Sequence, residues 1–207
     1  MLVQTLWWAS NALIVFLLVR AVKGRFFTKY PVFYCYLGCV LLVSFTRFYA
    51  LFFEPWSYAQ FYWYTQFLSI AVGYCIIWEL YSKSLHSYPG VVQISRAIVS
   101  TALILLLAGF LNNVLVGPVW GAARTVMDLE RNMRSVQAIL LIALMGLVSY
   151  YAIPLGRNLR GVFSGYGFFV GASIVRLTVR SYLGNPSGPI WVYFPPITFL
   201  VSLIVFV

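Results

Sequence analysis

The chain has 207 residues, of which 62% are hydrophobic and only 9% are charged. About a quarter of the residues of a soluble domain are charged, so this composition excludes a soluble globular protein and predicts an all-α, polytopic membrane protein. The formal net charge of +10 comes mostly from basic residues beside apolar segments, where they meet lipid headgroups. No basic stripe with interleaved aromatic residues indicates nucleic-acid binding.

Seven apolar segments are predicted to cross about 30 Å of hydrocarbon as helices. They lie at residues 2–19, 31–53, 58–80, 97–114, 136–153, 161–182 and 190–207, and we expect them to form a single transmembrane domain over residues 1–207. The first segment lacks a basic leader and a small-residue cleavage site, so it is interpreted as a retained helix and not as a signal peptide. Short connections between most segments favour antiparallel neighbours.

Basic residues in the connections set the predicted orientation. One set of connections holds eight of them: Arg20, Lys23, Arg25, Lys29, Lys83, Arg96, Arg157 and Arg160. The other set holds four: Arg124, Arg131, Arg134 and Arg180. Because basic residues concentrate in cytoplasmic loops, we expect the N-terminus outside and the C-terminus in the cytoplasm, across a plasma membrane or a bacterial inner membrane.

The link over residues 115–135 is the one long outer connection. We expect the fifth helix to begin near Val126 and to project about two turns beyond the membrane, which leaves Arg134 in the outer connection. Glu130 stands four residues before Arg134, the spacing of a helical ion pair. Pro154 is expected to end this helix on the inner side.

Arg176 lies inside the sixth segment. An arginine within a span costs several kcal/mol unless it faces the bundle, pairs or reaches the interface. Gly161 and Gly165 share its helix face, and small residues mark close approach between membrane helices, so we expect Arg176 to point inward. The same spacing of glycines recurs at Gly167 and Gly171.

Arg47 lies in the second segment at a similar depth, and we expect it to meet Arg176 in one cavity of the outer leaflet. Paired guanidinium groups suit a carboxylate, a phosphate or a lipid headgroup. The polar side chains expected to line this site are those of Tyr62, Tyr64 and Gln66. In the alternative, both arginines extend to the interface or pair with Glu54 and backbone carbonyls, and no ligand site exists.

Two further features fall within the apolar segments. Glu79 is followed four residues later by Lys83, so we expect a helical ion pair; a proton relay would need deeper acidic groups. Pro195 and Pro196 remove two backbone donors from the last segment, which predicts a kink or an unwound stretch. This feature is interpreted either as a hinge or binding notch, or as a static kink.

Several chemistries are excluded by what the chain lacks. The only histidine is His86, so bis-histidine haem and a histidine-based zinc site cannot form within one chain. No lysine lies deep in a span to carry a retinal Schiff base, and no GxSxG, HExxH or P-loop motif is present. Because no pair of embedded carboxylates is available for acid–base chemistry, we expect no enzyme, no cofactor and no metal.

Two functions from different classes fit these features. The first is a module that binds or senses a small anionic or amphipathic ligand near Arg47 and Arg176. The alternative is a structural or accessory subunit that packs against other membrane proteins; a small-solute transporter ranks third because no internal repeat is evident. The chain ends at Val207 within an apolar run. A sensor predicts a cytoplasmic continuation beyond this point, whereas a subunit predicts an end close to it.

Overall fold

The computed structural model describes residues 2–53, 56, 58–86, 88–116, 123–183 and 189–206. These residues contain helices and no strands, which confirms the all-α prediction. Four of the described helices contain stretches long and apolar enough to cross a membrane: Gln4–Lys23, Pro31–Phe53, Glu130–Tyr150 and Arg157–Arg180. Glu54, the expected partner of Arg47, lies outside the described residues.

Each predicted segment falls largely within one long helix. The helices are α1 (Leu2–Lys23), α2 (Phe26–Lys29), α3 (Pro31–Phe53), α4 (Tyr58–Ser84), α5 (Pro89–Val116), α6 (Ala123–Tyr150), α7 (Arg157–Leu183) and α8 (Pro189–Phe206). Most extend beyond the apolar segments because a helix continues its backbone hydrogen bonds into the polar interface. The largest difference is α5, which begins at Pro89 and not at residue 97. Proline suits a first helical position because the amide there has no intrahelical partner.

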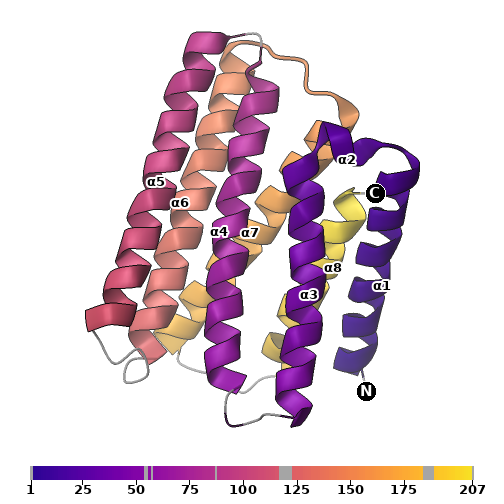
Figure 1. The fold of residues 1–207 in the computed structure, drawn as a ribbon, viewed down its shortest axis with the longest axis vertical. Helices are drawn as coiled ribbons and strands as arrows, with labels where there is room; N and C mark the ends of the chain where they lie inside the picture. Colours follow the sequence, from indigo (N-terminus) through magenta and orange to yellow (C-terminus); the bar gives the residue numbers. More distant parts are fainter. Residues whose placement is uncertain are drawn as a thin grey trace.

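The long helices lie side by side in a bundle, with α7 crossing obliquely behind α3 and α4 (Figure 1). α4 packs against α3, α5, α6 and α7, whereas α1 packs against α3 and α8. Figure 1 also places the N-terminus at the end of the bundle opposite α2. The core is apolar, and its fully buried side chains include Leu37, Ile77 and Leu144. α4 is thus a central helix of the bundle, in contact with four other helices.

α6 ends in a left-handed turn at Ala152, whose φ is 48°. The Ile153 amide donates to the Val148 carbonyl at 3.0 Å, which closes the last turn in the manner of a Schellman motif. Pro154, the predicted stop, follows this turn and prevents the helix from resuming. The helix thus ends a few residues before the end predicted from the apolar segment.

The carboxylate of Glu79 on α4 caps the start of α3. Its Oε2 accepts a hydrogen bond from the Phe33 amide at 2.9 Å, and its Oε1 accepts one from the Val32 amide at 3.4 Å. Pro31 has no amide hydrogen, so these are the first free donors of the helix. The predicted ion pair with Lys83 is wrong: Lys83 is exposed, and the buried carboxylate is used by α3.

Gly161 and Gly165 face α8 at close range. A Cβ atom on Gly165 would lie 2.9 Å from the Ser202 carbonyl oxygen and 2.5 Å from the Phe206 ring. A Cβ atom on Gly161 would lie 3.3 Å from another carbonyl oxygen of α8. This approach depends on the absence of side chains at the two glycines.

Gly167 and Gly171 stand in a different environment. Nothing lies within 4 Å of a Cβ atom placed on either residue, so this second pair does not mark a helix contact within the described part of the chain. The two GxxxG spacings on α7 therefore differ in what they face. The GxxxG spacing in the sequence does not distinguish the pair that contacts α8 from the pair that does not.

α8 is helical through Pro195 and Pro196. The Thr198 hydroxyl lies 2.9 Å from the Phe194 carbonyl oxygen and 3.1 Å from that of Pro195, and donates toward both. The predicted unwound stretch is therefore absent. A hinge at the two prolines stays a prediction.

Replacing Gly165 by alanine tests the contact between α7 and α8. We expect Gly165→Ala to lower the free energy of unfolding by about 1–3 kcal/mol, because a backbone carbonyl cannot move aside as a side chain can. Gly171→Ala is the matched control and should leave the melting temperature almost unchanged. Thermal unfolding in detergent measures both variants, and equal melting temperatures would contradict this contact.

Replacing Glu79 by alanine tests the cap. Glu79→Ala should cost about 1–2 kcal/mol and speed amide exchange at Val32 and Phe33, because their donors lose the carboxylate. Lys83→Ala should change neither quantity. If Lys83→Ala were as costly as Glu79→Ala, the helical ion pair and not the cap would account for the effect.

Candidate functional site

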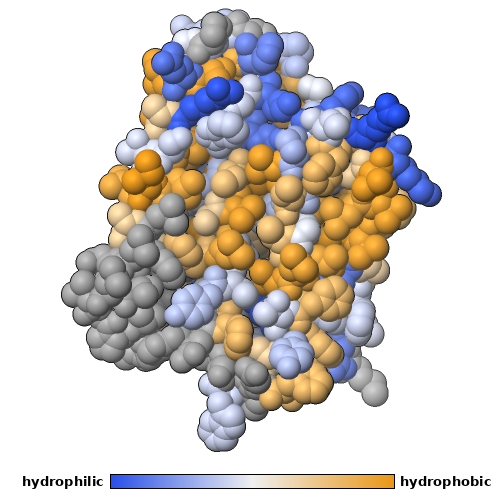
Figure 2. Space-filling view, viewed as in Figure 1, coloured by the Kyte–Doolittle hydropathy of each residue, from blue (hydrophilic) through white to orange (hydrophobic). Residues whose placement is uncertain are grey.

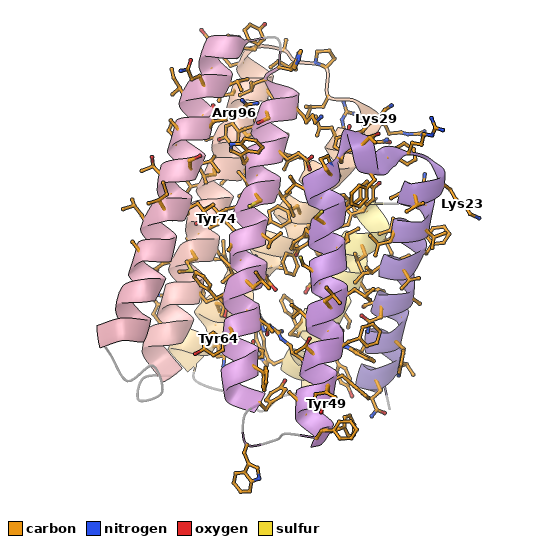
Figure 3. The ribbon with its side chains drawn as sticks, in the orientation of Figure 1. Lys23, Lys29, Tyr49, Tyr64, Tyr74 and Arg96 are labelled. Carbon is orange, nitrogen blue, oxygen red and sulfur yellow. The ribbon has the colours of Figure 1, made fainter. Side chains whose placement is uncertain are left out.

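Four polar side chains from α3, α4, α6 and α7 form one connected group inside the bundle. We call this group, which consists of Arg47, Gln66, Glu130 and Arg176, the polar cluster. Tyr49 and Tyr64, close in sequence to Arg47 and Gln66, lie toward the end of the bundle away from Lys23 and Lys29 (Figure 3). The polar cluster thus occupies the half of the bundle opposite α2.

Arg47 is held by one face of α4. Its Nε donates to the Thr65 hydroxyl at 2.8 Å. Its Nη2 donates to Gln66 Oε1 at 3.0 Å and to the Tyr62 carbonyl oxygen at 3.4 Å. The guanidinium carbon also lies 4.5 Å from the centroid of the Tyr62 ring, a cation–π distance. These contacts orient the guanidinium and join α3 to α4.

Gln66 connects the two arginines through Glu130. Its Oε1 accepts from Arg47, while its Nε2 donates to Glu130 Oε1 at 2.5 Å. The same carboxylate oxygen lies 3.8 Å from Arg176 Nη2. The Glu130 side chain is 5% exposed and that of Arg176 is 25% exposed. One amide and one carboxylate therefore link the cations of α3 and α7.

The structure brings together most of the residues predicted for this site. Arg47, Arg176, Tyr62 and Gln66 belong to the same group of contacts. Tyr64 does not: it is 54% exposed and contacts neither arginine. The reason is helical geometry, because a residue two positions from Tyr62 or Gln66 points to the opposite face of α4.

Sequence reasoning missed the role of Glu130. We expected it to pair with Arg134, yet no ion pair joins these two among the described side chains, and Glu130 turns toward Arg176 instead. Glu130, Arg134 and Gln137 follow the i, i+4, i+7 spacing of one helix face. That spacing, leading into an apolar segment, was the available signal for an inward polar stripe.

Arg134 lies one turn deeper on α6 and is 2% exposed, so the prediction that it stands in an outer connection is wrong. Its Nη1 donates to Gln137 Oε1 at 3.1 Å, and its guanidinium carbon lies 5.1 Å from the Phe169 ring centroid. Its Nε has no hydrogen-bond partner. This buried cation thus contacts the Gln137 amide and the Phe169 ring, and it lies close to Tyr36, Tyr74 and Tyr166.

Gly73 on α4 makes room for polar groups beside Arg134. A Cβ atom there would overlap the Tyr166 hydroxyl and lie 2.8 Å from Gln137 Nε2. The Gln137 amide donates to the Ile70 carbonyl at 3.0 Å, whereas the buried Tyr166 hydroxyl has no partner. Buried polar atoms are usually paired, so Arg134 Nε and the Tyr166 hydroxyl are two exceptions among the described residues.

Among the described side chains of this region, positive charges outnumber negative ones. Three guanidinium groups (Arg47, Arg134 and Arg176) lie in the same part of the bundle as one carboxylate, that of Glu130. Arginine does not lose its proton in proteins, so these guanidinium groups carry more positive charge than one carboxylate neutralises at any ordinary pH. An uncompensated charge inside a bundle is costly, and an anion would offset it. No group of three potential metal-ligating side chains occurs in the described part of the chain.

Comparison with known proteins finds no relative of this chain. No protein-family model matches the sequence, and neither a curated protein nor a solved structure is significantly similar to it. The chemistry of the side chains is therefore the basis on which a function is assigned.

Replacing Gln66 by leucine tests the link between the two arginines. Gln66→Leu should lower the free energy of unfolding by about 2–3 kcal/mol, because it leaves a buried carboxylate and a guanidinium without their shared partner. Tyr64→Leu, on the opposite face of α4, is the matched control and should have little effect. Equal effects in chemical unfolding would show that Gln66 does not join the arginines.

Proposed function

We propose that the chain is a membrane module in which α1 and α3 to α8 all cross the bilayer, with the N-terminus outside. α4, α5 and α8 have 27, 28 and 18 residues, so each approaches or exceeds the length of a span. Strongly hydrophilic side chains gather at one end of the surface, above an apolar band (Figure 2). Lys23, Lys29 and Arg96 lie toward that end (Figure 3), as expected of a cytoplasmic face.

The burial of Arg134, which the sequence count had placed in an outer connection, supports this orientation. Arg134 no longer counts among the basic residues of the far end, and Arg47 and Arg176 belong to the bundle interior. The excess of basic residues at the end of α2 is therefore larger than the loops alone indicated. The polar cluster then lies in the outer half of the membrane.

In this proposal the module binds a small anionic or amphipathic ligand at the polar cluster. The observation that carries it is the state of Arg176. Its guanidinium makes one ion contact, at 3.8 Å, and no hydrogen bond within the described residues, and its side chain is partly exposed. Guanidinium has five N–H donors in a planar fork, which fits a carboxylate or a phosphate.

The surface beside Arg176 suits an amphipathic ligand. Val175 and Phe168 on α7 are exposed apolar side chains that would face the lipid. An acyl chain could lie along them while its anionic head reaches Arg176. The ligand would then enter from the outer leaflet.

A signalling step follows from the shared carboxylate. An anion on Arg176 would compete with Glu130 for the guanidinium, and Glu130 is also bonded to Gln66. Gln66 in turn holds Arg47 of α3. A ligand that prefers one arrangement of these bonds would shift α3, α4, α6 and α7 between two states, which is the requirement for a sensor.

The module is proposed to be non-enzymatic. Glu130 is the one carboxylate of the cluster, and Gln66 and Arg176 already hold it, so no second carboxylate is placed for acid–base chemistry among the described residues. The competing candidate is an accessory subunit of a membrane complex. The same experiment separates the two functions.

Native mass spectrometry of the protein, gently solubilised from its natural membrane, tests the proposal. A bound small anion or lipid should remain on the wild type and on Arg180→Gln, and should be lost from Arg176→Gln. Arg180 is the matched control because it is an exposed arginine one turn away on the same helix. A stoichiometric protein partner, with no small molecule on any variant, would contradict ligand binding and favour the accessory subunit.

A further inference from the structure

A cavity lies at the end of the molecule away from the polar cluster, between α4 and α5. Its volume is about 410 Å³, and it is lined by Ser82, His86, Val92, Gln93 and Arg96. Ser82 and His86 are four residues apart on and just after α4, and Gln93 and Arg96 are three apart on α5. The spacing on α5 places Gln93 and Arg96 on one helix face, and both sides of the helical hairpin present polar groups to the same space.

Arg96 is held in position within this cavity. Its Nε donates to the Ser82 hydroxyl at 3.1 Å, and its guanidinium carbon lies 5.1 Å from the centroid of the Trp78 ring. Its Nη groups make no hydrogen bond with the described residues. An arginine fixed through Nε and through its flat face keeps four N–H donors directed outward, which is the arrangement that binds phosphate oxygens.

The remaining lining groups agree with an anion. His86 and Gln93 add hydrogen-bond donors, and none of the lining residues is acidic. The carboxylate of Glu79, one turn before Ser82 on α4, is used by the start of α3.

We propose that this cavity binds a terminal phosphate group, presented either by the phosphate monoester of phosphatidic acid or as free phosphate. Its volume is within the range of small-molecule sites. Trp78 is 38% exposed next to Arg96, and tryptophan is typical of the level at which headgroups lie. The site does not share residues with the polar cluster and does not depend on the ligand proposed there.

The test uses the full chain and two sources of the same phosphate group. The chain in neutral detergent is titrated with inorganic phosphate, and separately reconstituted in bilayers of phosphatidylcholine with or without phosphatidic acid. Thermal unfolding and native mass spectrometry report binding. We expect the wild type and Lys83→Gln to bind, and Arg96→Gln to bind at least tenfold more weakly.

The two arms identify the source of the phosphate. Binding of phosphatidic acid without binding of inorganic phosphate assigns the site to a lipid headgroup, and binding of both assigns it to the phosphate group itself. Arg96 and His86 are exposed, and the melting temperature of each ligand-free variant checks that it folds. His86→Ala provides a second variant, for which weaker binding is also expected. The proposal is overturned if neither probe binds, or if Arg96→Gln binds as tightly as Lys83→Gln.

Discussion

The arrangement of the bundle depends on a single carboxylate placed between two guanidinium groups. Glu130 accepts from Gln66 and faces Arg176, and Gln66 accepts from Arg47, so one acidic side chain fixes the mutual positions of four helices. Hydrogen bonds of this kind are short-ranged and directional, and a buried group without its partner is costly. Among the described side chains of this region, guanidinium groups outnumber carboxylates, and this excess of positive charge supports the proposed anionic ligand.

The sequence was sufficient for the helical segments and insufficient for their polar partners. Apolar runs are a local property, and each predicted run falls largely within one helix. The two predicted ion pairs, Glu79 with Lys83 and Glu130 with Arg134, were also local, and both are wrong. An exposed pair of this spacing contributes only about 0.2–0.5 kcal/mol, whereas a hydrogen bond to a buried charge contributes about 1.5–3 kcal/mol. Hydrogen bonds between helices are therefore favoured over ion pairs within one helix, and the spacing of residues along one helix does not reveal them.

α4 shows how one helix serves several neighbours at once. Near its start it presents Gln66 to the polar cluster, in its middle Gly73 leaves space for the Tyr166 hydroxyl, and near its end Glu79 caps α3. Its last turn reaches the cavity through Ser82. The glycine spacings of α7 were visible in the sequence, but Gly73 belongs to no such motif. Its importance follows only from the side chains that the fold places opposite it.

The most direct test of the link between α6 and α7 is a double-mutant cycle on Glu130 and Arg176. Unfolding free energies would be measured for Glu130→Gln, Arg176→Gln and the double variant, with Arg180→Gln replacing Arg176→Gln in a control cycle. The account predicts a coupling of at least about 1 kcal/mol for Arg176 and almost none for Arg180. Additive effects in both cycles would contradict the account, because Glu130 would then not hold Arg176 in place.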